Sequence, residues 1–370
     1  LNQHLRLLAT IYLAVYGLVL IVGGRLRKQR LAAWALVAIS ALELIQFDRI
    51  TVSTGRSTVT KNELRARTGY NDLTVEALQD IKANEHDFFR LTKTRPSAPG
   101  RWVSLNDAMV FGYYDTSSYS SFNNTNYIRF LAASGAVRIE SELDTRWVMG
   151  VRGDPLLAAF VCEKYLLTEQ PQAYAASGAY TRLADYGADT LLRNQLFLPL
   201  GLAFTDYITE QEFARLSRDD RDDALVRVAV LPDDDAGAKS GLVRVDAAEL
   251  RRQTREIPLQ RVLEARRQTA LALTSFRPWR ITGTMRLGQK IILVVQTPFD
   301  RGWRALVDKK DAPTMRADAG LLGVAVDSGE HMIELRYRSP FLPIGCVISA
   351  AALFILAIVR WRWPRLPFSD

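Results

Sequence analysis

The chain has 370 residues, of which 48% are hydrophobic and 24% charged, and its formal net charge is +8. Most of this positive excess lies in two short segments, at 25–30 and 360–365, so the long stretch between them is nearly neutral. A nucleic-acid-binding surface needs basic residues clustered on a folded domain, and the composition therefore excludes nucleic acid as a partner.

Three stretches are much more apolar than the rest of the chain: residues 7–24, 31–47 and 341–359. Each is close to the about 20 residues that a helix needs to cross roughly 30 Å of hydrocarbon. We predict three transmembrane helices, with the lipid bilayer as a partner. A removable signal peptide is the alternative for the first stretch, but such peptides have a basic start, a shorter apolar core and a small-residue cleavage site.

Basic residues predict how these helices are oriented. They flank the apolar stretches as Arg25, Arg27, Lys28 and Arg30 in the first loop and as Arg360, Arg362 and Arg365 in the tail. Because Lys and Arg near the ends of spans are retained in the cytoplasm, both segments are predicted to be cytoplasmic and residues from about 50 to 340 extracytoplasmic. The chain begins with Leu and enters an apolar stretch almost at once, so we expect it to be the C-terminal part of a longer multi-pass protein.

The extracytoplasmic region is predicted to be α+β. A helix is indicated after Asp72 or Thr74 by apolar residues at helical spacing, and strands are indicated by HDFFRLTK and GRWVSL. Alternating helix-like and strand-like runs over 138–213 predict a mixed α/β layer. The acid-rich segment SRDDRDDALVRVAVLPDDDAG does not have the spacing of a calcium loop, and we predict a solvated loop there.

Residues 278–337 contain short β-type runs separated by turn residues, which predict a small β-sandwich next to the membrane. We therefore divide the chain into four parts. Two transmembrane helices with the basic loop 25–30 occupy 1–50, a mixed α/β domain 51–276, a membrane-proximal β-domain 277–340, and a transmembrane helix with its basic tail 341–370.

One stretch, MVFGYYDTSSYSSFNNTNYIRFLAASG, mixes tyrosines with Ser, Asn and Thr. Tyrosine rings offer an apolar face with a polar tip, and amide side chains offer hydrogen bonds, so a glycan is one predicted ligand. The candidate substrate-binding residues are Tyr114, Tyr119, Asn123, Asn124 and Tyr127. The alternative is a long loop that its own aromatic residues hold in place, and this structural interpretation is favoured.

Trp303 follows Asp-Arg-Gly in the segment FDRGWRALVDKK, where a turn leads into a strand. It could be a platform for a sugar ring, which would add it to the candidate substrate-binding residues, or it could fill the core of the small β-domain. A large aromatic residue at the start of such a strand is ordinarily buried, so the core is the favoured position.

Cysteine and histidine usage gives no metal site. Cys162 and Cys346 fall in different predicted compartments, and the three histidines are scattered through the sequence without metal-ligand spacing. We therefore expect no metal and no other cofactor in this chain.

Several pieces of the sequence resemble YfhO-type bacterial membrane proteins. They are TPFDRGW, ALVD, RADAGLLGVAV and SGEHMIELRYRSP near the C-terminus, and NDLTVEALQDIKANEHDFFRL, YSSFNNTNYIRFL and RNQLFLPLGLAFTDYI before them. The resemblance covers roughly residues 31–360. One departure is that Asp308 is followed by Lys309 where such proteins usually have Asp-Gly. A two-residue turn with positive φ disfavours lysine, so we predict a wider turn through Asp311 to Pro313.

The resemblance implies an integral-membrane glycosyltransferase of the GT-C type in the bacterial cell membrane. Such enzymes take a sugar from a polyprenyl-phosphate carrier and transfer it to an envelope glycan or polymer such as teichoic acid. Catalysis depends on an acidic residue in the first outer loop, which acts as a base or helps to position a divalent metal. This chain lacks that loop, so the catalytic centre, and any divalent metal of the full-length protein, is expected upstream.

Two acids near the end of the second apolar stretch are the weak catalytic candidates of this chain, Asp48 and Glu43. Ionisable groups in spans are costly and often functional, but Asp48 could simply pair with Arg49. Two functions remain open: the C-terminal part of a polyprenyl-phosphate-dependent glycosyltransferase, and a non-catalytic membrane-anchored module that binds a glycan or a partner protein.

Overall fold

The computed structural model describes residues 3–26, 28–53, 61–67, 69–97, 105–151, 154–233 and 241–362. The chain forms two compact units, one of Leu1–Leu73 with Pro96–Asp107 and one of Thr74–Arg95 with Ala108–Asp370. The predicted strand GRWVSL falls almost wholly outside the described residues, as does the end of the acid-rich segment.

The first unit contains the helices α1 (Gln3–Arg25), α2 (Gln29–Ser53) and α3 (Lys61–Arg65). Polar side chains join α1 to α2: the Tyr12 hydroxyl donates to the Gln46 side chain at 2.6 Å, and the Tyr16 hydroxyl donates to Glu43 at 2.5 Å. Together with α15 (Leu342–Arg362) of the second unit, α1 and α2 give three helices that are long and apolar enough to cross a membrane. All three lie at the positions predicted from hydropathy.

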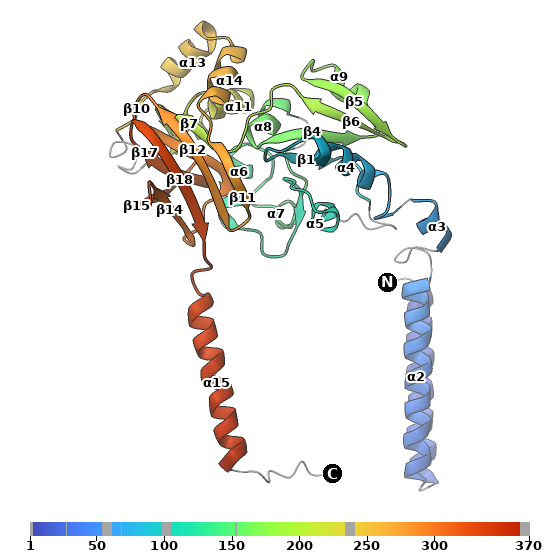
Figure 1. Cartoon of the computed structure of the whole chain (residues 1–370). Helices are drawn as coiled ribbons and strands as arrows, with labels where there is room; N and C mark the ends of the chain where they lie inside the picture. The colour runs from blue at the N-terminus through green and yellow to red at the C-terminus, as the bar shows by residue number, and fades with distance from the viewer. Residues whose placement is uncertain are drawn as a thin grey trace. The chain divides into compact units, whose positions relative to one another are not determined.

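The second unit is a mixed α/β fold followed by α15 (Figure 1). Its remaining helices, with α5 shared between the two units, are α4 (Thr74–Asn84), α5 (Asp107–Phe111), α6 (Thr125–Ala133), α7 (Glu142–Arg146), α8 (Pro155–Phe160), α9 (Pro171–Ala175), α10 (Glu210–Ala214), α11 (Arg218–Arg227), α13 (Ala247–Glu256) and α14 (Leu259–Gln268).

Two sheets form the first part of this unit. One has the order β1-β4-β6-β5 and the other, wholly parallel, the order β10-β8-β9. Their strands are β1 (Arg90–Lys93), β4 (Glu163–Thr168), β5 (Tyr180–Tyr186), β6 (Asp189–Asn194), β8 (Asp206–Thr209), β9 (Ala229–Leu231) and β10 (Val243–Arg244). A further antiparallel pair joins β2 (Ser118–Tyr119) to β3 (Trp147–Val148). The helix predicted after Asp72 or Thr74 is α4, and it packs Ala77, Leu78 and Ile81 on the first sheet.

The region predicted to be β throughout is confirmed, and it builds two sheets. One has the order β11-β12-β18-β14-β15 and the other β16-β17-β13-β7. The strands are β7 (Leu202–Phe204), β11 (Ala272–Arg277), β12 (Arg280–Leu287), β13 (Ile291–Pro298), β14 (Trp303–Val307), β15 (Lys310–Ala312), β16 (Thr314–Ala317), β17 (Leu321–Val326) and β18 (Gly329–Tyr337). Residues of both sheets share one hydrophobic cluster, and β7 comes from an earlier part of the sequence.

The turn before β14 explains the Asp-Arg-Gly-Trp sequence. Asp300 accepts the Gly302 amide on its side chain at 2.7 Å and the Trp303 amide on its carbonyl at 3.1 Å. The Gly302 carbonyl in turn accepts the Arg338 amide at 2.9 Å, and a Cβ at position 302 would lie 2.4 Å from the Arg338 carbonyl oxygen. Glycine is therefore required where β14 and the chain after β18 approach each other.

For the acid-rich segment the sequence predicts a loop, and this prediction is wrong for its helix Arg218–Arg227 and for the buried strand β9 that follows. Residues Arg218–Arg227 form α11, whose N-terminus is capped by the Ser217 side chain. Asp219 and Asp220 occupy the first turn, where negative charge is favourable to the helix dipole, and Leu225 is buried. The prediction relied on the acid content and overlooked the Ser217 cap and the buried apolar residues of this helix.

The turn between β14 and β15 also differs from the prediction. Val307 pairs directly with Lys310, so the turn consists of Asp308 and Lys309 alone, with φ values of 52° and 68°. Asp308 tolerates this conformation better than most residues, and its side chain accepts the Met332 amide at 2.8 Å. The predicted wider turn through Asp311 to Pro313 is therefore wrong.

Lys309→Gly is expected to stabilise the second unit by about 0.5–1 kcal/mol. The substitution removes the left-handed strain on Lys309, which is offset in part by the greater freedom of glycine in the unfolded chain. The denaturant midpoint of the detergent-solubilised chain measures the change. Lys310→Gly is the matched control, because Lys310 lies in β15 and glycine weakens a strand; a lower midpoint for Lys309→Gly would contradict the expectation.

Candidate functional site

A pocket of about 230 Å³ lies where the tyrosine-rich stretch meets the body of the second unit. Polar groups line one part of it and apolar side chains the rest. The lining residues that carry the argument are Arg90, Asp115, Ser117, Tyr127, Gln296 and Pro298. This pocket is the candidate functional site.

Asp115 is the acid of this pocket. Its carboxylate accepts hydrogen bonds from the Thr92 hydroxyl at 2.7 Å, from the Thr116 amide at 2.6 Å and from the Ser117 hydroxyl. Burial nevertheless raises the pKa of Asp115 above its usual range, against these hydrogen bonds. A carboxyl group with a raised pKa in a pocket is suited to accept a proton from a bound hydroxyl.

Arg90, at the start of β1, supplies positive charge to the same pocket. Its guanidinium donates to the Val161 carbonyl at 2.5 Å and to the Gln296 carbonyl at 2.7 Å, and it lies over the ring of Phe88. These contacts fix the side chain and join β1 to β13. The pocket thus presents a cation on a strand and a carboxylate that three hydrogen bonds hold in a loop. Such fixed polar groups suit a polar ligand.

Tyr127 is the one tyrosine of the predicted site residues that lines the pocket. It lies in the first turn of α6, whose N-cap Asn124 accepts the Asn126 and Tyr127 amides at 2.9 and 3.2 Å. The Tyr127 hydroxyl donates to the Thr116 carbonyl, and burial raises its pKa. Tyr127 therefore holds the segment that carries Asp115 in place.

The other predicted residues of this stretch have structural partners. Asn123 donates to the Thr145 carbonyl at 2.8 Å, while Tyr119 stacks on Trp147 with ring centroids 4.3 Å apart. Tyr114 contacts the rings of Phe88 and Phe276 and keeps 42% of its surface exposed. These contacts match the favoured structural interpretation, in which the loop is held by its own aromatic residues.

Trp303 lies in the core of the β-domain. Only 7% of its surface is exposed, and its ring lies 5.2 Å from that of Tyr337. A sugar platform needs an open aromatic face, so this residue is excluded as a platform and takes the core position that the sequence favours.

Glu43 and Asp48 belong to α2 in the first unit. Glu43 accepts the Tyr16 hydroxyl and so joins α2 to α1, whereas Asp48 is exposed at the end of the apolar stretch. Within the described ranges, no three His, Cys, Asp or Glu side chains are grouped so that they could hold a metal ion.

Sequence reasoning missed the charged residues of the pocket, Asp115 and Arg90. Asp115 stands inside the quoted stretch, as the only acid in YYDTSSYSSFNNTNY, and this isolation is a signal that could have identified it. No local signal marks Arg90 or Gln296, since their contact joins positions 206 residues apart.

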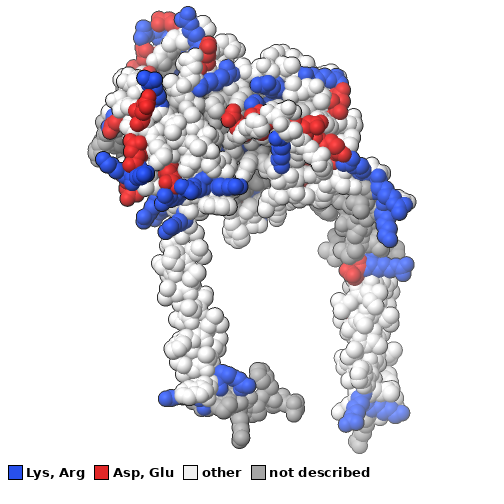
Figure 2. Space-filling model, in the orientation of Figure 1, with Lys and Arg blue, Asp and Glu red and all other residues white. Residues whose placement is uncertain are grey.

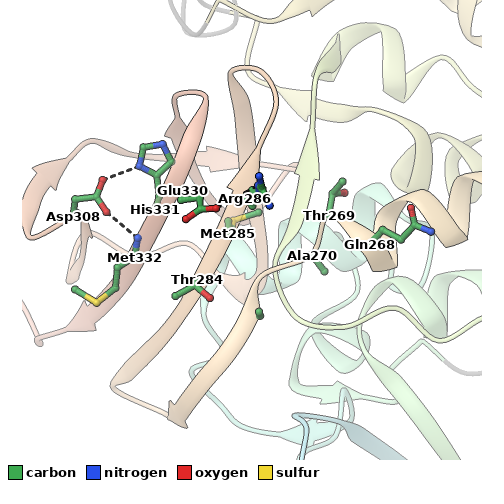
Figure 3. Close-up of a pocket in the computed structure, with 11 residues that line it drawn as sticks. Gln268, Thr269, Ala270, Thr284, Met285, Arg286, Asp308, Glu330, His331 and Met332 are labelled. Atoms are coloured by element: carbon green, nitrogen blue, oxygen red, sulfur yellow. Dashed lines mark hydrogen bonds and ion pairs between the residues drawn. The ribbon is translucent and has the colours of Figure 1, made fainter.

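A second, more open pocket of about 700 Å³ lies on β12 and β18 (Figure 3). Asp308 reaches His331 Nδ1 at 2.7 Å, and Glu330 and Arg286 lie beside them. The hydrogen bond to Asp308 raises the pKa of His331, and the Met332 amide followed by His331 lowers the pKa of Asp308. Both shifts reflect the contact between these two side chains, which secures the β14–β15 turn, so we assign this pair a structural role.

Taken together, these features define a membrane-associated protein that carries a mixed α/β folded unit with a small polar pocket. A sequence profile described as "Bacterial membrane protein YfhO" matches residues 1–239 and 238–349, and the chain belongs to this family.

A curated relative, "Uncharacterized protein YfhO" of Bacillus subtilis (strain 168), is 26% identical over 76 residues. This alignment covers 20% of the present chain and 9% of the relative, so the matched segment spans about a tenth of that protein. No solved structure matches the chain significantly.

Proposed function

We propose that this chain is the acceptor-side part of a membrane glycosyltransferase, which transfers a sugar from a polyprenyl-phosphate carrier to a cell-envelope polymer outside the cytoplasm. The observation that carries the proposal is the Asp115 pocket in a member of a bacterial membrane protein family. The basic residues at the ends of the apolar helices support the extracytoplasmic placement of the second unit.

The chemistry of the pocket suits a ligand rich in hydroxyl groups. Asp115 accepts hydrogen bonds, the Ser117 hydroxyl both donates and accepts, and Arg90 provides a fixed positive charge. At about 230 Å³ the pocket is smaller than typical small-molecule sites of roughly 300–1,000 Å³. It would therefore hold a single unit of a polymer, with the rest of the chain outside.

In this proposal Asp115 orients or deprotonates an acceptor hydroxyl. A hydroxyl is a poor nucleophile until a base takes its proton, and a carboxylate with a raised pKa is better matched to that task than an ordinary aspartate. The sugar carrier and any divalent metal would bind to parts of the full-length protein outside this pocket.

Asp115→Asn in the full-length protein is expected to lower sugar transfer about 100-fold or more, the usual size of a general-base effect. The measurement follows radiolabelled sugar from a polyprenyl-phosphate donor into envelope polymer in membranes. Glu140→Gln, an exposed acid that does not line the pocket, is the matched control and should leave transfer unchanged. Transfer by Asp115→Asn within twofold of the wild type would overturn the role of the pocket.

The second candidate function is a non-catalytic module that binds a glycan or a partner. It is favoured by one observation: among the described residues that line the pocket, Asp115 is the sole carboxylate. The same assay separates the two, because a binding module would retain glycan binding, measured by calorimetry, while the full-length protein transferred no sugar from any polyprenyl-phosphate donor.

A further inference from the structure

Four arginines form a single row across one face of the β-domain. Arg277 pairs with Arg280 across the β11–β12 turn, Arg280 pairs with Arg336 of β18, and Arg336 pairs with Arg304 of β14. Directly opposed residues of antiparallel strands point to the same face, and like charges in such positions repel each other. The row is therefore a concentrated positive charge.

This row lies on the solvent-exposed face of the sheet. The neighbouring positions Ile281, Leu335 and Ala305 point the other way and are 2%, 0% and 1% exposed, whereas all four arginines are exposed. Among the described acids, Glu334 faces the row and binds Arg280 at 2.5 Å and Arg336 at 2.8 Å. Arg277 and Arg304 have no ion pair with a described residue, so most of the charge is uncompensated.

Further residues extend the row at the same end of the sheet. Arg301 and Arg338 are exposed, as are Trp279 at 61% and Phe341 at 76%. A hollow of about 690 Å³ opens beside them, lined among others by Arg129, Arg301, Asp300 and Phe341. Figure 2 shows Lys and Arg side chains gathered at the end of the folded region from which α15 leaves. We call Arg277, Trp279, Arg280, Arg304, Arg336 and Arg338 the arginine edge.

The connection to α15 keeps this edge close to the start of the apolar helix. The Arg338 amide still bonds to Gly302 of the sheet at 2.9 Å, and the Leu342 amide already bonds to the Ser339 carbonyl at 3.3 Å. Five steps of chain from Tyr337 to Leu342 reach at most about 18 Å. The arginine edge therefore cannot lie far from the polar surface of a bilayer that α15 crosses.

We propose that the arginine edge lies against the bilayer and binds the phosphate groups of anionic lipids, with Trp279 and Phe341 at the level of the headgroups. Arginine forks match phosphate oxygens, basic residues near an anionic surface are each attracted to it, and tryptophan concentrates at the membrane interface. The nearby acids Glu334 and Asp300 offset this attraction only in part, because Glu334 is one carboxylate shared between two arginines and the arginine edge has five guanidinium groups. This docking would fix the second unit relative to the membrane, and it does not depend on the proposed transferase activity.

The test places the full chain in lipid nanodiscs and measures how strongly a headgroup nitroxide quenches Trp279. The chain has seven tryptophans, so the Trp279 signal is the difference between wild type and Trp279→Phe. Quenching should be stronger in phosphatidylcholine mixed with phosphatidylglycerol than in phosphatidylcholine alone, and added salt should reduce it by screening the charges. Equal quenching in the two lipids, or no effect of salt, would overturn the proposal.

A variant that removes three arginines with no ion pair to a described residue provides the second measurement. The triple variant with Arg277→Gln, Arg304→Gln and Arg338→Gln leaves both arginine partners of Glu334 in place. It should lower the ratio of membrane-docked to undocked second unit roughly hundredfold. The control carries Arg251→Gln, Arg255→Gln and Arg261→Gln, exposed positions of α13 and α14 with the same loss of charge. Quenching should fall to the phosphatidylcholine level in the first variant only, and equal behaviour of the two variants would contradict lipid docking.

Discussion

Trp303→Ala is expected to lower the free energy of unfolding of the second unit by about 3–5 kcal/mol, the usual cost of truncating a buried aromatic residue. Trp303 starts β14, is 7% exposed, and packs with Tyr337, its direct partner on β18. Removing the indole would leave a cavity in the hydrophobic cluster that residues of both sheets share. The denaturant midpoint from far-ultraviolet circular dichroism in detergent measures the loss.

Two variants serve as controls for this prediction. Trp303→Phe keeps an aromatic ring in the core and should cost less than Trp303→Ala. Trp279→Ala removes an exposed indole and should change the unfolding free energy by no more than about 0.5 kcal/mol, as is usual at the surface. If Trp303→Ala were no more costly than Trp279→Ala, the core position of Trp303 would be refuted.

The features that could be predicted from the sequence are those that local patterns encode. An apolar run of about 20 residues is sufficient for a spanning helix, so α1, α2 and α15 followed directly from hydropathy. Short alternating strands with turn residues between them likewise indicated the strands of the β-domain. Trp303 was assigned to the core by its size and position, and the structure agrees.

Features that depend on tertiary contacts were missed or predicted wrongly. The tight Asp308–Lys309 turn is possible because the Asp308 carboxylate accepts the Met332 amide and contacts the His331 ring. Both partners lie on β18, more than 20 residues away in the sequence. Alternation in sequence also cannot give the register that places four arginines in one row. The pocket could not be predicted for the same reason, because its residues Arg90 and Gln296 are far apart in the sequence and meet only in the folded second unit.

Asp222 is a buried acid outside these sites, and its environment contributes to the pH dependence of the stability of the second unit. It lies on α11 with 3% of its surface exposed, and neither of its oxygens accepts a hydrogen bond from a described donor. It faces Asp154, which already caps α8 by accepting the Leu156 and Leu157 amides at 2.8 and 2.9 Å. Burial first, and then the hydrogen bond and charge of Asp154, raise the pKa of Asp222 to about 8.

The sign of the pH effect follows from this raised pKa. In the unfolded chain Asp222 has an ordinary pKa of 3.8, so between about pH 4 and pH 8 the folded state holds a proton that the unfolded state has lost. The contribution of Asp222 to the free energy of unfolding therefore falls as pH rises through this window, by up to about 1.4 kcal/mol per pH unit, and levels off above pH 8. At pH 5 most of this decrease in unfolding free energy has not yet occurred.

Asp222→Asn should remove this contribution, because the amide is neutral at every pH and can still donate to Asp154. Its stability advantage over the wild type is expected to grow by on the order of 3 kcal/mol between pH 5 and pH 8, measured as denaturant midpoints across that range. Asp220→Asn, an exposed acid on the same helix, should follow the wild-type curve with a constant small offset. Parallel curves for Asp222→Asn and the wild type would mean that Asp222 is ionised in the folded protein, with its negative charge held beside that of Asp154.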